Sequence, residues 1–316
     1  MTPPLKKINI MGGDYEFTLD VSGPMDNYHL NYVPSDLPDI YKKILNQENF
    51  QVSEFSISNY CMMRERNMCQ MTAIPIFVNR GFRHGIIWVR KDSDISNVND
   101  LKNCKVGIKE YSQTAAVWLR GILLEDYDLH WSSIYWYANE KQRFMPPAQA
   151  NVKLISNDPE ELVIKGELDA YVAPRPFDIK KPPKDRVLRP LINDYVEVER
   201  KYFETSGIYP INHCLMIHHD TLTKNPELGY CLFKAYSKSK EKALKRKLGS
   251  TLLPWMDRQW PDIIELFDND PYPQGLTEPN KKNINKLINY LHEQKLIKVK
   301  PTLDDLFPSE SHQWKE

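Results

Sequence analysis

The sequence lacks the features of several large protein classes. Its five cysteines are widely spread and never form a CxxC pair: Cys61, Cys69, Cys104, Cys214 and Cys231. Such an odd, dispersed set supports neither a disulfide framework nor a zinc site. No apolar stretch of about 18 residues occurs and no apolar core follows the first lysines, so neither a membrane span nor a signal peptide is predicted. We therefore expect a cytoplasmic protein.

Net charge and cofactor motifs are also missing. The 42 basic and 42 acidic residues cancel, which argues against nucleic-acid or membrane binding and favours a small-molecule partner. The chain has no GxGxxG, P-loop, nucleophile elbow or HxxxH pattern, and the adjacent His218 and His219 point to opposite faces of a predicted strand. We expect no cofactor and no metal. The sequence leaves homo-oligomer formation open.

Predicted strands alternate with predicted helices along the 316 residues. This order favours an α/β fold with a mostly parallel sheet, and the length suggests two units. The predicted strands are residues 5–11, 51–56, 85–89, 104–109, 134–138, 152–155 and 213–218, with another in the sequence LDAYVAP. The predicted helices are 35–47 (capped by Ser35), one capped by Ser58 or Asn59, 112–126 (capped by Ser112), one opened by Asp158, 226–247 and 279–296.

Polar residues follow the predicted strands. Ligands of open α/β sheets bind beyond the carboxyl ends of the strands, so we expect Asp14 and residues 56–60, 80–84 and 112–114 to converge. The most informative segment is residues 73–92, where a basic loop with Arg80, Arg83 and His84 precedes an apolar run. Guanidinium groups bind carboxylates in a bidentate geometry. The segment therefore predicts a carboxylate-binding site.

Several strings along the chain resemble one family. They are GDYEF, AIPIF, RGFRHGIIWVR, KEYSQTAAVWLRGIL, ETSGIYPINH and DPYPQGLTEPNKKNINKLINYLHEQKL, and together they resemble the 4,5-dihydroxyphthalate decarboxylase family, which is related to the type II periplasmic substrate-binding proteins. The family's PSRxFRH pattern reads VNRGFRH here.

The resemblance implies a two-lobed α/β fold with a ligand cleft between the lobes. Lobe one would comprise residues 1–100 and 205–316, and lobe two residues 101–204. The crossings between them would fall near residues 93–97 and 203–207.

The resemblance also implies decarboxylation, without a cofactor, of a small hydroxylated aromatic dicarboxylate such as 4,5-dihydroxyphthalate. A deprotonated hydroxyl para to the carboxylate pushes electrons into the ring, an acid protonates the carbon, and CO2 leaves. His213 and His84 are the candidates for proton transfer because histidine titrates near neutrality. Glu54 and Asp14 could accept the phenolic proton.

The remaining candidates would bind substrate. Arg80 and Arg83 would hold the carboxylate that stays on the ring, since a cation on the departing one would slow its loss. Neutral hydrogen bonds would come from Ser56, Asn59 and Tyr60, and a helix N-terminus with Gln113 and Thr114 would face them from the other lobe. The alternative roles are a surface charge for each arginine, a structural role for each histidine, and ordinary helix capping for Gln113 and Thr114.

A non-catalytic function is the competing hypothesis. The fold alone is equally that of a small-molecule carboxylate-binding protein, such as a transporter's substrate-binding protein or a sensor, because a fold does not imply a function.

Overall fold

The computed structural model describes residues 4–46, 50–247 and 254–316. The chain divides into two compact units, each discontinuous in sequence. Unit 1 comprises Met1–Asn79, His213–Lys282 and Pro301–Glu316, and unit 2 comprises Arg80–Asn212 and Asn283–Lys300. Within the described residues, each unit contains one six-stranded sheet with helices packed on it. The predicted two-lobed α/β fold is therefore confirmed.

The sheet of unit 1 has the order β2-β3-β1-β4-β12-β5. Its strands are β1 (Lys6–Gly12), β2 (Gly23–Met25), β3 (Tyr28–Pro34), β4 (Val52–Ser56), β5 (Met71–Arg80) and β12 (Ile211–His218). β1 is parallel to both β3 and β4, whereas β12 runs antiparallel to β4 and pairs His213 with Ser56. The carboxyl ends of β1 and β4 therefore lie at the same edge as His213.

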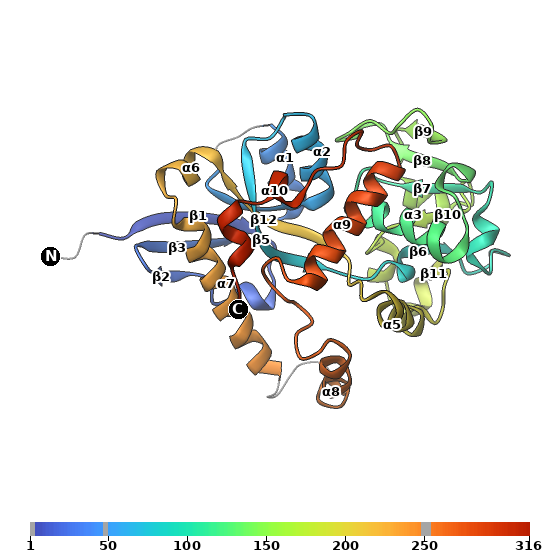
Figure 1. The fold of residues 1–316 in the computed structure, drawn as a ribbon. Coiled ribbons are helices and arrows are strands. Elements are labelled where there is room, and N and C mark those ends of the chain that lie inside the picture. Colours follow the sequence, from blue (N-terminus) through green and yellow to red (C-terminus); the bar gives the residue numbers. More distant parts are fainter. Residues whose placement is uncertain (1–3, 47–49, 248–253) are drawn as a thin grey trace. The chain divides into compact units, whose positions relative to one another are not determined.

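Helices cover both faces of this sheet (Figure 1). α7 (Leu228–Lys247) packs its apolar side on one face, where Ile10, Ile76 and Leu215 belong to the same buried cluster as Leu232. α1 (Leu37–Leu45) and α2 (Ile57–Glu65) lie on the opposite side. The unit also contains α6 (His219–Lys224), α8 (Met256–Leu266) and α10 (Leu303–Leu306).

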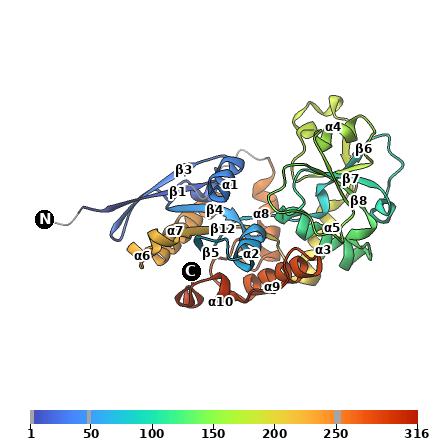
Figure 2. The ribbon, with the colours of Figure 1, turned by 90° about the horizontal axis from the view of Figure 1, so that it is seen from above.

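The sheet of unit 2 has the order β11-β6-β10-β7-β8-β9. Its strands are β6 (Ile87–Arg90), β7 (Lys105–Ile108), β8 (Tyr135–Asn139), β9 (Val152–Ile155), β10 (Ala170–Val172) and β11 (Leu188–Pro190). β10, β7, β8 and β9 are parallel neighbours, and β6 runs antiparallel to β10 and β11. α4 (Pro159–Ile164) lies on one side of the sheet and α3 (Thr114–Tyr127) on the other (Figure 2).

α9 (Glu278–Glu293) spans the division between the units, which falls after Lys282. Its second half packs on α3 of unit 2, where a Cβ atom on Gly121 would lie 2.3 Å from the Tyr290 ring. A glycine is therefore required at position 121, because any side chain there would displace the tyrosine. α5 (Tyr195–Ser206) completes unit 2.

Most predicted elements are present, with shifted ends. The strand predicted at residues 152–155 has these bounds, and the strand at 51–56 begins one residue later. Three caps were predicted wrongly: α1 begins after Asp36, α2 after Ser56 and α3 after Gln113. The predicted end of the first helix at Gln47 lies outside the described residues. Both sheets are mixed, and three of the five strand pairs in the sheet of unit 2 are parallel.

The boundaries of the units differ from those derived from the resemblance. Residues 80–100 belong to unit 2 because β6 pairs with β10 and β11 in the second sheet. Residues 283–300 join unit 2 through α9. The predicted ligand cleft shared by the lobes stays a prediction.

Candidate functional site

A buried carboxylate and a histidine form the centre of a hydrogen-bond network in unit 1. Glu54 Oε1 lies 2.5 Å from His213 Nδ1 and accepts a 2.7 Å hydrogen bond from the Tyr15 hydroxyl. Its other oxygen, Oε2, accepts a 2.7 Å bond from the Gly13 backbone N–H. On the far side of the imidazole, His213 Nε2 lies 2.6 Å from the Tyr41 hydroxyl. Sequence analysis predicted Glu54 and His213 as site residues, and the structure brings them together.

The strand order produces this network. Glu54 and His213 lie on the neighbouring antiparallel strands β4 and β12, at diagonal positions where two side chains of one face meet. Gly12 and Gly13 end β1 beside them, and a Cβ atom on Gly13 would lie 2.5 Å from the Tyr15 ring. The glycine pair allows the backbone to approach the carboxylate so closely that its N–H becomes a ligand of Glu54.

The network fixes the protonation of its members. Burial, and then the charge of Glu54, raise the pKa of Tyr15 well above its ordinary value, so its hydroxyl remains a donor. A carboxylate only accepts hydrogen bonds, so His213 must donate from Nδ1. Nε2 is consequently the nitrogen that gains and loses a proton. Glu54 is 1% exposed and the His213 side chain 13% exposed, so only the histidine has access to solvent.

The other predicted site residues of unit 1 are placed differently. Asp14 is exposed directly after the glycine pair. Ser56 accepts a hydrogen bond from the Asn59 N–H and is the N-cap of α2. Tyr60 is buried in the core, where its hydroxyl donates to the Leu306 carbonyl. Ser56, Asn59 and Tyr60 therefore have structural contacts that account for them.

The predicted basic residues belong to unit 2 and are buried rather than exposed in a loop. Arg80 and Arg83 are 8% and 6% exposed. His84 is 1% exposed; its Nε2 lies 3.6 Å from an oxygen of Asp126, and its ring packs against Tyr202. A three-residue turn, His84–Ile86, separates this basic segment from β6. His84 is thus buried, and neither of its ring nitrogens makes a hydrogen bond among the described residues.

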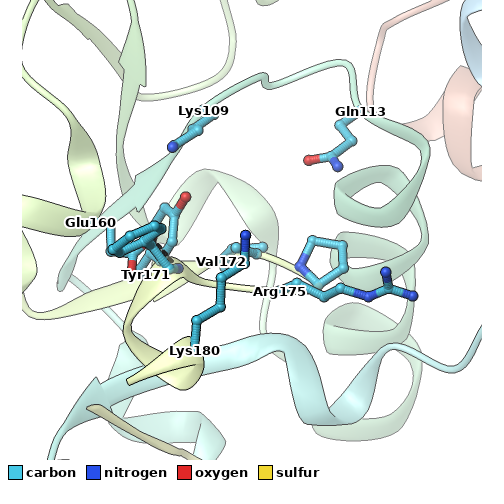
Figure 3. Close-up of a pocket in the computed structure, with 10 residues that line it drawn as sticks. Lys109, Gln113, Glu160, Tyr171, Val172, Arg175 and Lys180 are labelled. Carbon is cyan, nitrogen blue, oxygen red and sulfur yellow. Dashed lines mark hydrogen bonds between the residues drawn. The ribbon is translucent and has the colours of Figure 1, made fainter. Parts of the chain in front are cut away.

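A pocket of about 300 Å³ opens in unit 2 (Figure 3). It lies beyond the carboxyl ends of the parallel strands β7 and β10, where ligands of α/β sheets bind. Three cationic side chains line it, those of Lys109, Arg175 and Lys180. Lys109 also pairs with Asp158 at 2.9 Å. The excess of positive charge suits an anionic ligand.

The three pocket cations were not predicted from the sequence. The available signal was position: Lys109 directly follows β7, and Arg175 comes three residues after β10. Gln113, which was predicted, lines the same pocket, while Thr114 is buried at the first position of α3. The predicted cap Ser112 instead donates its hydroxyl to Glu110 at 2.7 Å.

Neither a membrane-spanning helix nor a metal-binding cluster occurs in the described part of the chain. None of its helices is long and apolar enough to cross a membrane. No group of three or more histidine, cysteine and acidic side chains in this part of the chain is arranged to hold a metal ion.

Comparison with known proteins finds two similar proteins with the same description. No protein-family model matches it. A 4,5-dihydroxyphthalate decarboxylase from Comamonas testosteroni is 26% identical over 292 residues, covering 86% of this chain and 87% of that protein. A second, from Pseudomonas putida, is 30% identical over 155 residues, covering 46% and 60%. The chain is similar to the 4,5-dihydroxyphthalate decarboxylases. The resemblance predicted from the sequence is thereby confirmed.

Solved structures show that the chain has the fold of the type II periplasmic binding proteins. The periplasmic sulfonate-binding protein SsuA from Methylobacillus flagellatus superposes with a TM-score of 0.60 at 11% identity, covering 97% of this chain and 92% of that one. The desulfurization enzyme DSZB superposes with a TM-score of 0.52 at 11% identity, covering 96% and 97%. At these identities the likeness is one of fold.

Proposed function

We propose that the protein decarboxylates a small hydroxylated aromatic dicarboxylate, such as 4,5-dihydroxyphthalate, without a cofactor. The single observation that carries the proposal is the Glu54–His213 pair, because one nitrogen of the histidine is fixed by a buried carboxylate and the other is left to exchange a proton. The names of the two relatives supply the substrate class. We also propose that the protein works in the cytoplasm.

The reaction consumes one proton. A substrate hydroxyl para to the departing carboxylate loses its proton to a base and donates electrons into the ring. The ring carbon then gains a proton from the His213 side of the network, and the carbon–carboxylate bond breaks to give CO2. Glu54 stabilises the imidazolium and holds its orientation, which is the role of the carboxylate in other acid–histidine pairs. His213 recovers its proton from solvent.

Cationic side chains that suit a carboxylate are found in unit 2. Arg80 and Arg83 are the predicted groups, and Lys109 and Arg175 are those that line the pocket. Exposed Asp14 is the proposed base for the phenolic proton. Glu54 suits this role less well than expected, because three donors already occupy its oxygens.

The second candidate function is binding without turnover. The positively charged pocket would serve a carboxylate-binding protein equally well, and the fold is shared with sulfonate-binding proteins. An enzyme releases CO2 over many cycles, whereas a binder gives at most a stoichiometric change.

The test is to mix purified protein with a large molar excess of 4,5-dihydroxyphthalate and to follow CO2 and 3,4-dihydroxybenzoate. We expect multiple turnovers, which His213→Ala abolishes while ligand binding measured by calorimetry persists. His29→Ala is the matched control, because His29 is an exposed histidine of the same sheet. Binding without product in the native protein would reject the decarboxylase and leave the binder.

A further inference from the structure

Both ring nitrogens of His213 are already in contact with protein groups. Nδ1 faces Glu54 at 2.5 Å and Nε2 faces the Tyr41 hydroxyl at 2.6 Å. Nε2 is the nitrogen that exchanges a proton, and its hydrogen bond ends on a tyrosine. A substrate atom that approaches Nε2 along this hydrogen bond therefore meets the Tyr41 oxygen first, unless the tyrosine moves away.

The packing of Tyr41 opposes such a movement. It lies on the buried side of α1 together with Ile40 and Ile44 and is 7% exposed. Its ring meets the Phe55 ring edge-on at 5.2 Å and the imidazole of His213 edge-on at 5.7 Å. Displacing it would remove buried aromatic contacts and break a short hydrogen bond at the same time.

The other tyrosine of the network is directed elsewhere. Tyr15 donates to Glu54 and accepts a 3.2 Å hydrogen bond from the Asn79 side chain. Its pKa is raised by burial and by the charge of Glu54, which makes it a poor acid. Tyr41 instead adjoins the histidine, within hydrogen-bond distance of Nε2.

We propose that Tyr41 is the group that protonates the substrate carbon, with His213 resupplying it. This inference rests on the proposed decarboxylation. The Tyr41 O–H bond breaks as the new C–H bond forms, and the proton on His213 Nε2 passes to the Tyr41 oxygen. The histidine is left neutral, with Nδ1–H still donated to Glu54. Loss of CO2 restores the aromatic ring, and solvent reprotonates Nε2.

The central experiment compares Tyr41→Phe with the native protein acting on 4,5-dihydroxyphthalate. Removal of a positioned acid lowers rates by roughly 100- to 10,000-fold, so we expect kcat to fall at least about 100-fold with KM little changed. Tyr290→Phe is the matched control, because it removes a buried tyrosine hydroxyl that donates to Glu125 at 2.6 Å in unit 2. The control should keep its kcat.

Two readouts separate proton donation from a structural role. In mixtures of H2O and D2O, we expect a curved dependence of kcat on the deuterium fraction, because two protons are transferred in the same step. Incorporation of 3-fluorotyrosine at position 41, which keeps the ring and lowers the phenol's pKa, should move the alkaline limit of kcat to lower pH. An unmoved limit, or a Tyr41→Phe variant with native kcat, overturns the proposal while the decarboxylase assignment stands.

Hydrogen exchange separates failure of this inference from failure of the proposed function. In D2O, the carbon of 3,4-dihydroxybenzoate that would have carried the lost carboxylate should exchange its hydrogen by the reverse proton transfer. Exchange that Tyr41→Phe abolishes supports the donor role even if the native protein releases no CO2. Absence of both exchange and CO2 release rejects both proposals. If Tyr41→Phe fails to fold, the 3-fluorotyrosine protein decides.

Discussion

The Tyr15 hydroxyl lies 2.7 Å from the same oxygen of Glu54 that faces His213. One carboxylate oxygen thus accepts from a tyrosine and from a histidine, while its partner oxygen accepts from a backbone N–H. Burial and the charge of Glu54 raise the pKa of Tyr15, so its hydroxyl stays protonated. The pair therefore links the stability of the fold to pH.

Tyr15 should make the protein sensitive to alkali. Its pKa is raised in the folded state, so the stabilisation is fully present below the ordinary tyrosine pKa of about 10 and is lost as pH rises beyond it. Above about pH 10 the free energy of unfolding should fall less steeply for Tyr15→Phe than for the native protein, by up to about 1.4 kcal/mol per pH unit. Urea denaturation across this pH range measures the slopes. Tyr135→Phe, which alters an exposed tyrosine, is the control, and equal slopes for Tyr15→Phe and the native protein would contradict the prediction.

Glu54→Gln should reduce catalysis more than stability. The amide keeps the shape of the carboxylate but no longer compensates an imidazolium, and its N–H2 group can turn the histidine to the other tautomer. We expect kcat to fall roughly 100- to 10,000-fold. The tautomer of His213 can be read from nitrogen chemical shifts in the same sample. A native kcat together with the Nδ1–H tautomer would show that the carboxylate is not needed.

The pocket cations of unit 2 should contribute to ligand affinity. Arg175→Met and Lys109→Met each remove one charge from the pocket lining. Arg175 is exposed and Lys109 shares its charge with Asp158, so we expect a loss of about 1 kcal/mol each, roughly a fivefold rise in Kd. Calorimetry with phthalate measures it, and the loss should shrink at high salt. Lys165→Met removes a charge outside this pocket and should leave Kd unchanged.

Arg120→Met should destabilise unit 2. The fully buried guanidinium donates to the Tyr111 carbonyl and to the Gln294 side chain, and lies 3.8 Å from the centre of the Tyr111 ring. Methionine fills part of the space but leaves two buried acceptors unsatisfied, at about 1–3 kcal/mol each. We expect the free energy of unfolding to fall by about 2–4 kcal/mol in chemical denaturation. A neutral result would show that the cavity admits water or repacks.

The fold could be predicted from the sequence where periodic patterns were long. The helices α3 and α9, of 14 and 16 residues, carry their signal in many apolar positions. β2, β3, β11 and α5 were missed because they are short or polar, and pairing with neighbours rather than local propensity decides their structure. The second half of α9 belongs to unit 2 because Tyr290 packs on Gly121. These two residues lie far apart in the sequence.

The candidate site could be predicted only residue by residue. Glu54 and His213 could be named because each is a titratable residue in a predicted strand. Their pairing depends on the antiparallel register of β4 and β12, which no local pattern specifies. Tyr41 was missed for a related reason: an aromatic residue on the apolar face of a helix reads as core, and only the direction of its hydroxyl shows otherwise.

The discontinuity of unit 2 limits how this protein can be divided. A fragment comprising residues 80–212 alone would leave out the segment that supplies Tyr290 and Gln294. Gly121 would then face solvent in place of an aromatic ring, and Arg120 would lose one of its acceptors. Expression of this half as an independent domain therefore requires residues 283–300 to be joined to it through a linker, and a gene cut at the strand boundaries alone should yield an aggregating product.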